Sequence, residues 1–295
     1  MQSVASATAT AFRRILIATD FSPASDKALH HGIALARHFD ATLYLTHVVS
    51  SLGFVLAGPD ATAAACDAAW RDARQLEQRL DSSGILTGVT HQVAVREGDV
   101  WEEIQKLVAD ESIDLIVVGT HGRAGIRKLV LGSVAEEIFR HASCPVLTVG
   151  PCAPQESSVN TALQHVLVAT DFSEAANDAL PFALTAAKNE HAKLTLLHVI
   201  EQISGEAAGD PARVVSAVED RLRRLVPPDY EGEYDCRVEM GTIEEAIMDV
   251  AEQEHADVII LGLKPPSTYI SHLGWLHAYR IVCGACCPVL TIRSA

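Results

Sequence analysis

The residues best suited to chemistry form a glycine-rich segment from Gly119 to Val134, which reads G-T-H-G-R-A-G-I-R-K-L-V-L-G-S-V. Gly119 and Gly122 stand three apart, and nine residues separate Gly122 from Gly132. Glycine lets the backbone take positive φ angles and lets a bulky anion approach the peptide N–H groups. A helical pattern begins at Ser133, and the first N–H groups of a helix lack partners within it. The segment therefore predicts a phosphate-binding loop that leads into a helix.

The same residues also allow an interpretation that needs no ligand. Glycines gather in many strand-to-helix loops, and Ser133 with Glu136 has the spacing of a capping box, which stabilises a helix by itself. The spacing matches neither the G-x-x-x-x-G-K-[ST] phosphate loop nor the G-x-G-x-x-G dinucleotide fingerprint. The glycines alone leave phosphate binding and simple loop geometry open.

The elements that must position this loop alternate between short β-rich runs and longer helical patterns, which predicts a parallel sheet covered by helices. Runs such as Ile15–Ala18 are apolar throughout, as buried parallel strands are. Asp20, Val48 and Gly119 each lie at the end of an expected strand, so they meet at the edge where open α/β sheets bind ligands. In the first half of the chain we expect strands at 14–18, 42–48, 89–95, 114–118 and 145–149, and helices at 22–38, 60–83, 99–111 and 133–142.

The second half of the chain repeats the first. I-L-I-A-T-D-F-S at 15–22 returns as V-L-V-A-T-D-F-S at 166–173, which indicates a tandem duplication. We therefore expect two doubly wound, Rossmann-like α/β domains with five parallel strands each. The expected organisation is a disordered tail at 1–12, domains at 13–150 and 165–295 and a linker at 151–164, with second-half strands near 165–169, 193–199, 234–239, 257–261 and 288–292.

Three features together resemble the universal stress protein family. Residues 119–133 match its nucleotide-binding signature, G-x2-G-x9-G-[ST] after an apolar strand. The A-T-D-F-S segment at 18–22 and the H-V pair at 47–48 are also similar to that family. The resemblance implies that the first domain binds ATP, with Mg2+ accompanying the phosphates. It further implies pairing of the two domains within the chain and allows a homodimer, but it names no protein partner.

The resemblance also implies a role for each residue of the site. Asp20 and the backbone at Val48 would contact adenine and ribose, while the glycines would leave room for the phosphates. The N–H groups of Ser133 and Val134, with the Ser133 hydroxyl, would hold the terminal phosphates. The expected set is Asp20, Val48, Gly119, His121, Gly122, Gly132, Ser133 and Val134, with Thr19, Thr120, Arg127 and Lys128 as additional members.

Several of these residues also have an interpretation without a ligand. Asp20 would then serve the strand-to-helix turn that follows it. His121 would be an exposed loop residue, and Arg127 and Lys128 would be solvated cations beside a helix. For these four residues both interpretations stay open.

The second domain departs from the signature where phosphates would bind. In the register of the repeat, the second and third glycines and the following serine become Pro265, Trp275 and Leu276. Proline lacks an N–H group, tryptophan fills the space, and leucine neither caps nor donates. We expect no ATP there; the second domain would be a structural partner, or a crevice formed by Pro266, Tyr269, Leu273 and Trp275 would hold a more apolar ligand. His47 returns here as His198, which favours a structural role for both histidines.

Composition excludes several other functions. A formal net charge of −15 argues against a nucleic-acid partner. No apolar run reaches the roughly eighteen residues of a membrane span, and no secretion signal precedes the repeat, so we expect a soluble cytoplasmic protein. The C-G-A-C-C run at 283–287, near His272 and His277, contains a C-x-x-C pair that can bind zinc or exchange thiols. No second pair completes a metal site, which favours ordinary packing.

These observations favour an ATP-binding, nucleotide-dependent regulator of a stress response, with no catalytic or metal-ligating residues assigned. Ligand binding alone can bias such a protein between states, and no nucleophile–base arrangement is evident. The alternatives are a slow ATPase or nucleotidyl-transfer enzyme, and a structural or protein-binding module that binds no nucleotide.

Overall fold

The computed structural model describes residues 12–21, 23–50, 59–120, 131–154, 163–201, 211–264 and 272–293. The chain divides into two compact units, an N-terminal unit of residues 11–161 and a C-terminal unit that contains residues 162–295. No helix within the described ranges combines the length and the apolar character needed to cross a bilayer.

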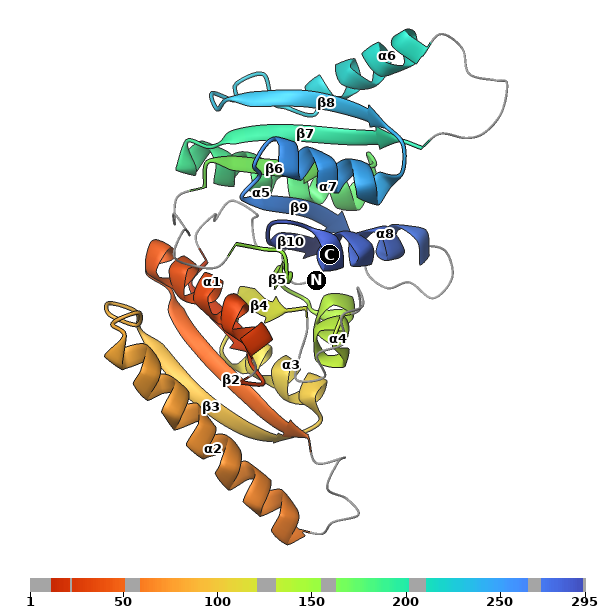
Figure 1. The fold of residues 1–295 in the computed structure, drawn as a ribbon. Helices are drawn as coiled ribbons and strands as arrows, with labels where there is room; N and C mark the ends of the chain where they lie inside the picture. The colour runs from red at the N-terminus through yellow and green to blue at the C-terminus, as the bar shows by residue number, and fades with distance from the viewer. Residues whose placement is uncertain are drawn as a thin grey trace, which may run out of the picture. The chain divides into compact units, whose positions relative to one another are not determined.

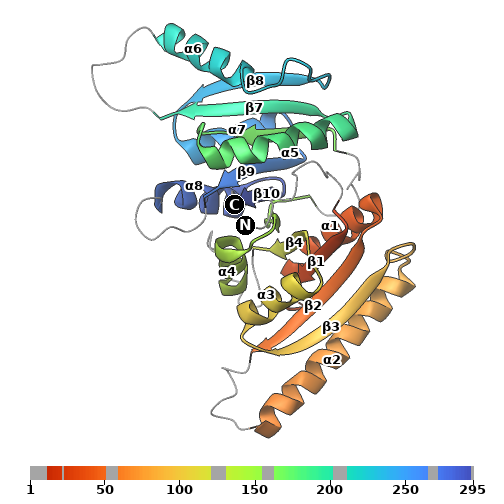
Figure 2. The same cartoon turned by 180° about the vertical axis from the view of Figure 1, so that it is seen from behind.

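The N-terminal unit contains a parallel five-stranded sheet with helices on both faces (Figure 1, and Figure 2 from behind). Its strand order is β3-β2-β1-β4-β5, so the order reverses beside β1. The predicted doubly wound α/β fold is thereby confirmed for this unit. Its strands are β1 (Arg14–Ala18), β2 (Thr42–Ser50), β3 (His91–Gly98), β4 (Leu115–Gly119) and β5 (Val146–Val149), and its helices are α1 (Pro23–Phe39), α2 (Pro59–Ser82), α3 (Val100–Asp110) and α4 (Ser133–His141).

The C-terminal unit repeats this topology, with the order β8-β7-β6-β9-β10 and all pairs parallel. The central strands of both units are buried on both faces, as their apolar runs predict: Ile15, Leu115 and Val166 are each 0% exposed. The strands are β6 (His165–Ala169), β7 (Lys193–Ile200), β8 (Tyr234–Met240), β9 (Val258–Leu263) and β10 (Val289–Arg293), and the helices are α5 (Glu174–Glu190), α6 (Pro211–Arg223), α7 (Ile243–Gln253) and α8 (His272–Gly284).

The ends of the N-terminal unit are packed close to their neighbours. Phe12, the last residue of the expected tail, is buried and lies edge-on against Phe39, with 5.5 Å between ring centroids. At the start of the expected linker, Lys27 Nζ donates to the carbonyls of Pro151 (2.6 Å) and Ala153 (3.0 Å). Residues 1–11 and 155–162 lie outside the described part of the chain.

An aspartate at the amino end of the fourth strand joins the two central strands in each unit. Asp114 precedes β4, and its carboxylate accepts the N–H groups of Arg13 (2.8 Å) and Arg14 (3.1 Å) at the start of β1. Asp257 does the same at the start of β6, accepting the N–H group of His165 at 2.9 Å. These bonds hold the starts of the two central strands together, and because the strands are parallel their carboxyl ends lie at the same edge.

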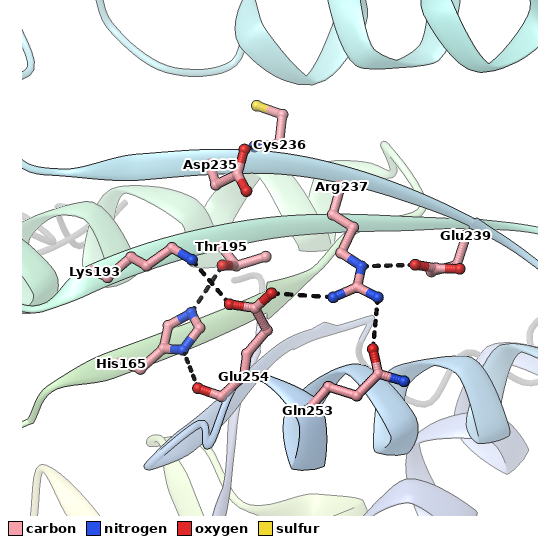
Figure 3. A network of polar contacts seen from close by, with 9 residues as sticks. All are labelled: His165, Lys193, Thr195, Asp235, Cys236, Arg237, Glu239, Gln253 and Glu254. Carbon is pink, nitrogen blue, oxygen red and sulfur yellow. Dashed lines mark hydrogen bonds and ion pairs between the residues drawn. The ribbon is translucent and has the colours of Figure 1, made fainter.

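A polar network fixes the end of α7 to the amino ends of the neighbouring strands (Figure 3). The carboxylate of Glu254 lies between Lys193 Nζ (2.9 Å) and Arg237 Nη1 (3.1 Å). Below it, the buried ring of His165 bonds through Nδ1 to the Glu254 carbonyl (2.7 Å) and through Nε2 to Thr195 Oγ1 (2.8 Å). His165 and Lys193 are the first residues of β6 and β7, so this network lies at the opposite edge from the strand carboxyl ends.

Candidate functional site

The candidate site lies at the carboxyl ends of β1 and β4, where the strand order reverses. β1 pairs with β2 on one side and with β4 on the other, in parallel registers that bring the three strand ends together. Open α/β sheets bind ligands in the crevice outside such a switch point. Asp20 follows β1 and Gly119 ends β4, at the edge where the sequence predicts them; Val48 lies inside β2, which extends past the expected end to Ser50.

The turn after β1 is built by its own side chains. Thr19 Oγ1 accepts the N–H group of Phe21 at 3.0 Å and lies 3.0 Å from Ser25 Oγ inside the protein. Phe21 takes a left-handed conformation with φ 59°, which bends the chain into α1. The hydroxyl of Thr19, an additional member of the predicted site, thus serves the turn. The half-buried Asp20 is the acidic side chain that this turn presents at the edge.

A histidine joins the ends of β1 and β2. His47 Nδ1 lies 2.7 Å from the Thr19 carbonyl, so Nδ1 carries the proton, and its ring packs against Phe21 with 4.7 Å between centroids. His198 makes the corresponding contacts at 2.7 Å and 4.6 Å in the C-terminal unit. Because both units keep the arrangement, these histidines have the structural role that their recurrence predicts. Their bonds tie the second strand of each unit to the residue that follows the first strand.

The glycine-rich loop is closed at its neck by a backbone hydrogen bond. Gly132 N–H donates to the Thr120 carbonyl at 2.8 Å, and Thr120 N–H donates to the Val149 carbonyl at 3.1 Å. The start of α4 is therefore held beside the end of β4, although eleven residues separate Thr120 from Gly132 in the sequence. The side chain of Thr120 is buried, so its contribution at this neck is made by the backbone.

The predicted capping box is wrong. The N-cap of α4 is Gly132, with φ −61° and ψ 152°, and among the described residues no side chain makes a capping hydrogen bond there. Ser133 is exposed and lies one residue inside the helix, while Glu136 is bound by Arg140 at 2.8 Å. The start of α4 consequently presents backbone N–H groups and the positive end of the helix dipole without a cap from Ser133 or Glu136, which is an arrangement suited to an anion.

Four predicted members of the site, His121, Gly122, Arg127 and Lys128, lie outside the described residues. The other members have these positions: Thr19 and Asp20 follow β1, Val48 lies inside β2, Gly119 and Thr120 lie at the end of β4, and Gly132, Ser133 and Val134 lie at the start of α4. Within the described ranges, no group of three His, Cys, Asp or Glu residues is placed to hold a metal ion.

The corresponding edge of the C-terminal unit holds a cavity of about 320 Å³. Asp171 and His198 line it from the strand ends, and Trp275 and His277 line it from α8. Asp171 also serves its own turn, because its Oδ1 accepts the N–H group of Ser173 at 2.9 Å. Of the residues expected to form an altered crevice here, Trp275 does so; Pro266, Tyr269 and the side chain of Leu273 lie outside the description.

Sequence reasoning missed a buried pair beside this cavity. His277 Nδ1 lies 3.1 Å from Oε1 of Glu244, which is only 4% exposed. The sequence pattern singles out His277 only because it lies near the cysteine run at 283–287. A usable signal was present in the register of the repeat, where Glu244 takes the place of Trp101 and His277 takes the place of Val134.

Gly262, which corresponds to Gly119, has a packing role. A Cβ atom on Gly262 would lie 2.0 Å from the carbonyl oxygen of Ala175, in the first turn of α5. The first glycine of the signature is thus required in the C-terminal unit by helix–strand packing, whether or not a ligand binds.

The cysteines do not assemble a site among the described residues. Cys283 and Cys287 are buried in the protein interior. Burial raises the pKa of Cys144 to about 12, while a hydrogen bond from Cys287 lowers the pKa of Cys286 to about 7. All are free thiols.

Comparison with known proteins connects this geometry to a family. The model of the Universal stress protein family matches twice, at residues 11–150 and 162–293. A universal stress protein of Methanocaldococcus jannaschii is 32% identical over 139 residues, which are 47% of this chain and 82% of that protein. One of Mycolicibacterium smegmatis is 29% identical over 190 residues, 63% of each chain. The solved universal stress protein of Archaeoglobus fulgidus has a TM-score of 0.71 at 23% identity, covering 96% of this chain and 98% of that one, a likeness of fold.

Proposed function

Because the chain belongs to the universal stress protein family, we propose that its N-terminal unit binds ATP and thereby acts as a nucleotide-dependent regulator of a stress response. The observation that carries this proposal is the uncapped start of α4, held beside the end of β4 by the bond between Gly132 and Thr120. An anion-binding helix start at the switch point of a parallel sheet suits a nucleotide with several phosphates.

Each part of the nucleotide has a matching group in this unit. Asp20 would accept hydrogen bonds from the ribose hydroxyls, and the backbone at Val48 would lie along the adenine. Gly119, Gly122 and Gly132 would leave the phosphates room to approach the backbone. The N–H groups of Ser133 and Val134, with the Ser133 hydroxyl, would hold the terminal phosphates, and His121, Arg127 and Lys128 would balance part of their charge.

Mg2+ would enter with the phosphates. Magnesium keeps several water ligands and commonly binds through substrate phosphates with few protein groups. The described residues fit this mode, because they offer no cluster of acidic side chains that would hold the ion by itself.

The proposal is tested by titrating the full chain with ATP and Mg2+ in a calorimeter. We expect one ATP to bind per chain. We expect Gly122→Pro to abolish this binding, since the C-terminal unit has proline, Pro265, at the corresponding position. Product release from the same samples, followed by chromatography, tests the enzymatic alternative. Two ATP molecules per chain, or unchanged affinity in Gly122→Pro, would contradict the proposed site.

A further inference from the structure

The cavity of the C-terminal unit is largely apolar. At about 320 Å³ it lies near the lower limit of pockets that hold small organic ligands. Among the described residues, the lysine, arginine, aspartate and glutamate side chains that line it are Asp171 and Lys264, so this lining has no excess of positive charge for a phosphate. Much of the apolar lining comes from β9, α7 and α8, including Leu261, Leu263, Ile243, Ile247, Ala278 and Ile281.

A buried carboxylate lies behind one wall of this cavity. Oε1 of Glu244 lies 2.9 Å from Arg280 Nη1 and 3.1 Å from His277 Nδ1. Burial alone would raise the pKa of Glu244, but its backbone hydrogen bond in the first turn of α7 and the contacts with Arg280 and His277 lower it overall. Glu244 is therefore a carboxylate at neutral pH, and its position and contacts compensate the cost of burying the charge.

This carboxylate lies beside the ring of His277. Nδ1 is buried, 3.1 Å from Oε1, and because a carboxylate oxygen can only accept, this contact favours a proton on Nδ1. With the proton there, Nε2 is the ring nitrogen that can accept a hydrogen bond, on a side chain that lines the cavity. In the repeat, His277 takes the place of Val134, whose N–H group would face the phosphates in the proposed ATP site.

The neighbouring wall is aromatic. Trp275 lines the cavity and packs against Tyr279, with ring centroids 5.2 Å apart and an angle of 40° between the rings. Trp275 replaces Gly132, so a large ring stands at a position where the N-terminal unit has no side chain. Aromatic and branched aliphatic walls favour a flat apolar ligand.

We propose that this cavity binds a small uncharged aromatic molecule that donates one hydrogen bond, through a hydroxyl or ring N–H group, to Nε2 of His277. The site is separate from the proposed ATP site and does not depend on it. Its ligand lacks phosphates because the lining offers an acceptor and aromatic bulk where the N-terminal unit offers donors and space.

Two probes that differ by one donor test this inference: 2-naphthol and 2-methoxynaphthalene, titrated into the full chain in a calorimeter. We expect 2-naphthol to bind about 2- to 10-fold more tightly, the factor of one net hydrogen bond. His277→Leu should bind both probes equally, and Ala278→Phe, which fills the cavity, should bind neither. His141→Leu, which changes an exposed histidine of the N-terminal unit, should keep the wild-type preference.

A nitrogen NMR spectrum of the histidine rings gives a second measurement on the wild-type chain. The Nε2 resonance of His277 should move with 2-naphthol and stay in place with 2-methoxynaphthalene. Equal affinity of the two probes for the wild type, a preference that survives in His277→Leu, or an unmoved Nε2 resonance overturns the proposal. So does displacement of 2-naphthol by ATP, because the two sites are then the same.

Discussion

Replacing Gly262 by alanine should destabilise the C-terminal unit strongly. The added Cβ would lie 2.0 Å from the oxygen, 2.4 Å from the carbonyl carbon of Ala175 and 2.6 Å from the nitrogen of Ala176. All three are backbone atoms of the first turn of α5, so relief requires the helix to move away from β9. Overpacking of this kind costs about 3 kcal/mol, at the upper end of the usual range. For a unit of this size, that corresponds to a fall in Tm of roughly 10 °C.

Thermal unfolding followed by circular dichroism measures this effect, with Gly284→Ala as the matched control. A Cβ on Gly284 would approach Met248 Sδ to 2.8 Å, but that atom lies near the end of a flexible side chain that can turn aside. The control should therefore change the free energy of unfolding by less than about 1 kcal/mol, helped by the better helix propensity of alanine. If Gly262→Ala unfolds at the same temperature as the control, the close approach of α5 to β9 does not constrain this position, and the packing role of this glycine is refuted.

Three further changes test other parts of the structure. Gly132→Trp should lower ATP affinity at least about 100-fold, because the ring occupies the proposed phosphate space, and calorimetry that finds wild-type affinity would contradict this. Asp20→Asn should weaken ATP binding about 10-fold by loss of a charged acceptor, while the twin change Asp171→Asn leaves it unaltered. Glu254→Gln should lower the free energy of unfolding by about 1 kcal/mol at pH 7, and it should make that free energy less dependent on pH below neutrality. The bond from Lys193 lowers the pKa of Glu254 below its ordinary 4.5. The stabilisation that ionised Glu254 contributes to the wild type is therefore present above pH 4.5 and is lost as the pH falls through the lowered pKa. Urea unfolding between about pH 3 and pH 7 measures this loss.

The fold was predictable because its strongest signals are local and occur twice. The central strands are continuous apolar runs buried on both faces, and β1 and β6 begin and end where their sequences predict. Other strands differ by one or more residues at their ends: β2 extends to Ser50 beyond its expected end at 48, and the third strand, expected from residue 89, begins at His91. Val89 is buried like a strand residue, but its N–H group closes a turn onto Leu86, so burial alone does not identify a strand.

The details of the site were less predictable because they depend on contacts between distant segments. The spacing of Ser133 and Glu136 suits a capping box, yet the bond from Gly132 to Thr120 places the N-cap one residue earlier. Sequence spacing cannot show that bond, because it forms across the loop. Local patterns also do not show the pairing of His277 with Glu244, since the two residues lie on different helices, α8 and α7, with β9 between them in the sequence.

The duplication separates the groups that hold the strand ends from the groups that would meet a ligand. Both units keep a histidine bonded to the carbonyl after the first strand, together with the left-handed phenylalanine that packs on its ring. They differ in the helix that follows the fourth strand. Gly132, the N-cap of α4, and Val134 correspond to Trp275 and His277, which lie inside α8 because that helix begins at His272. Because the strand-end scaffold is common to both units, it cannot by itself select a ligand. In the two proposed sites these positions present different chemistry, a glycine and helix N–H groups in one and two aromatic rings in the other. We therefore expect changes at these positions to alter binding with little effect on the fold.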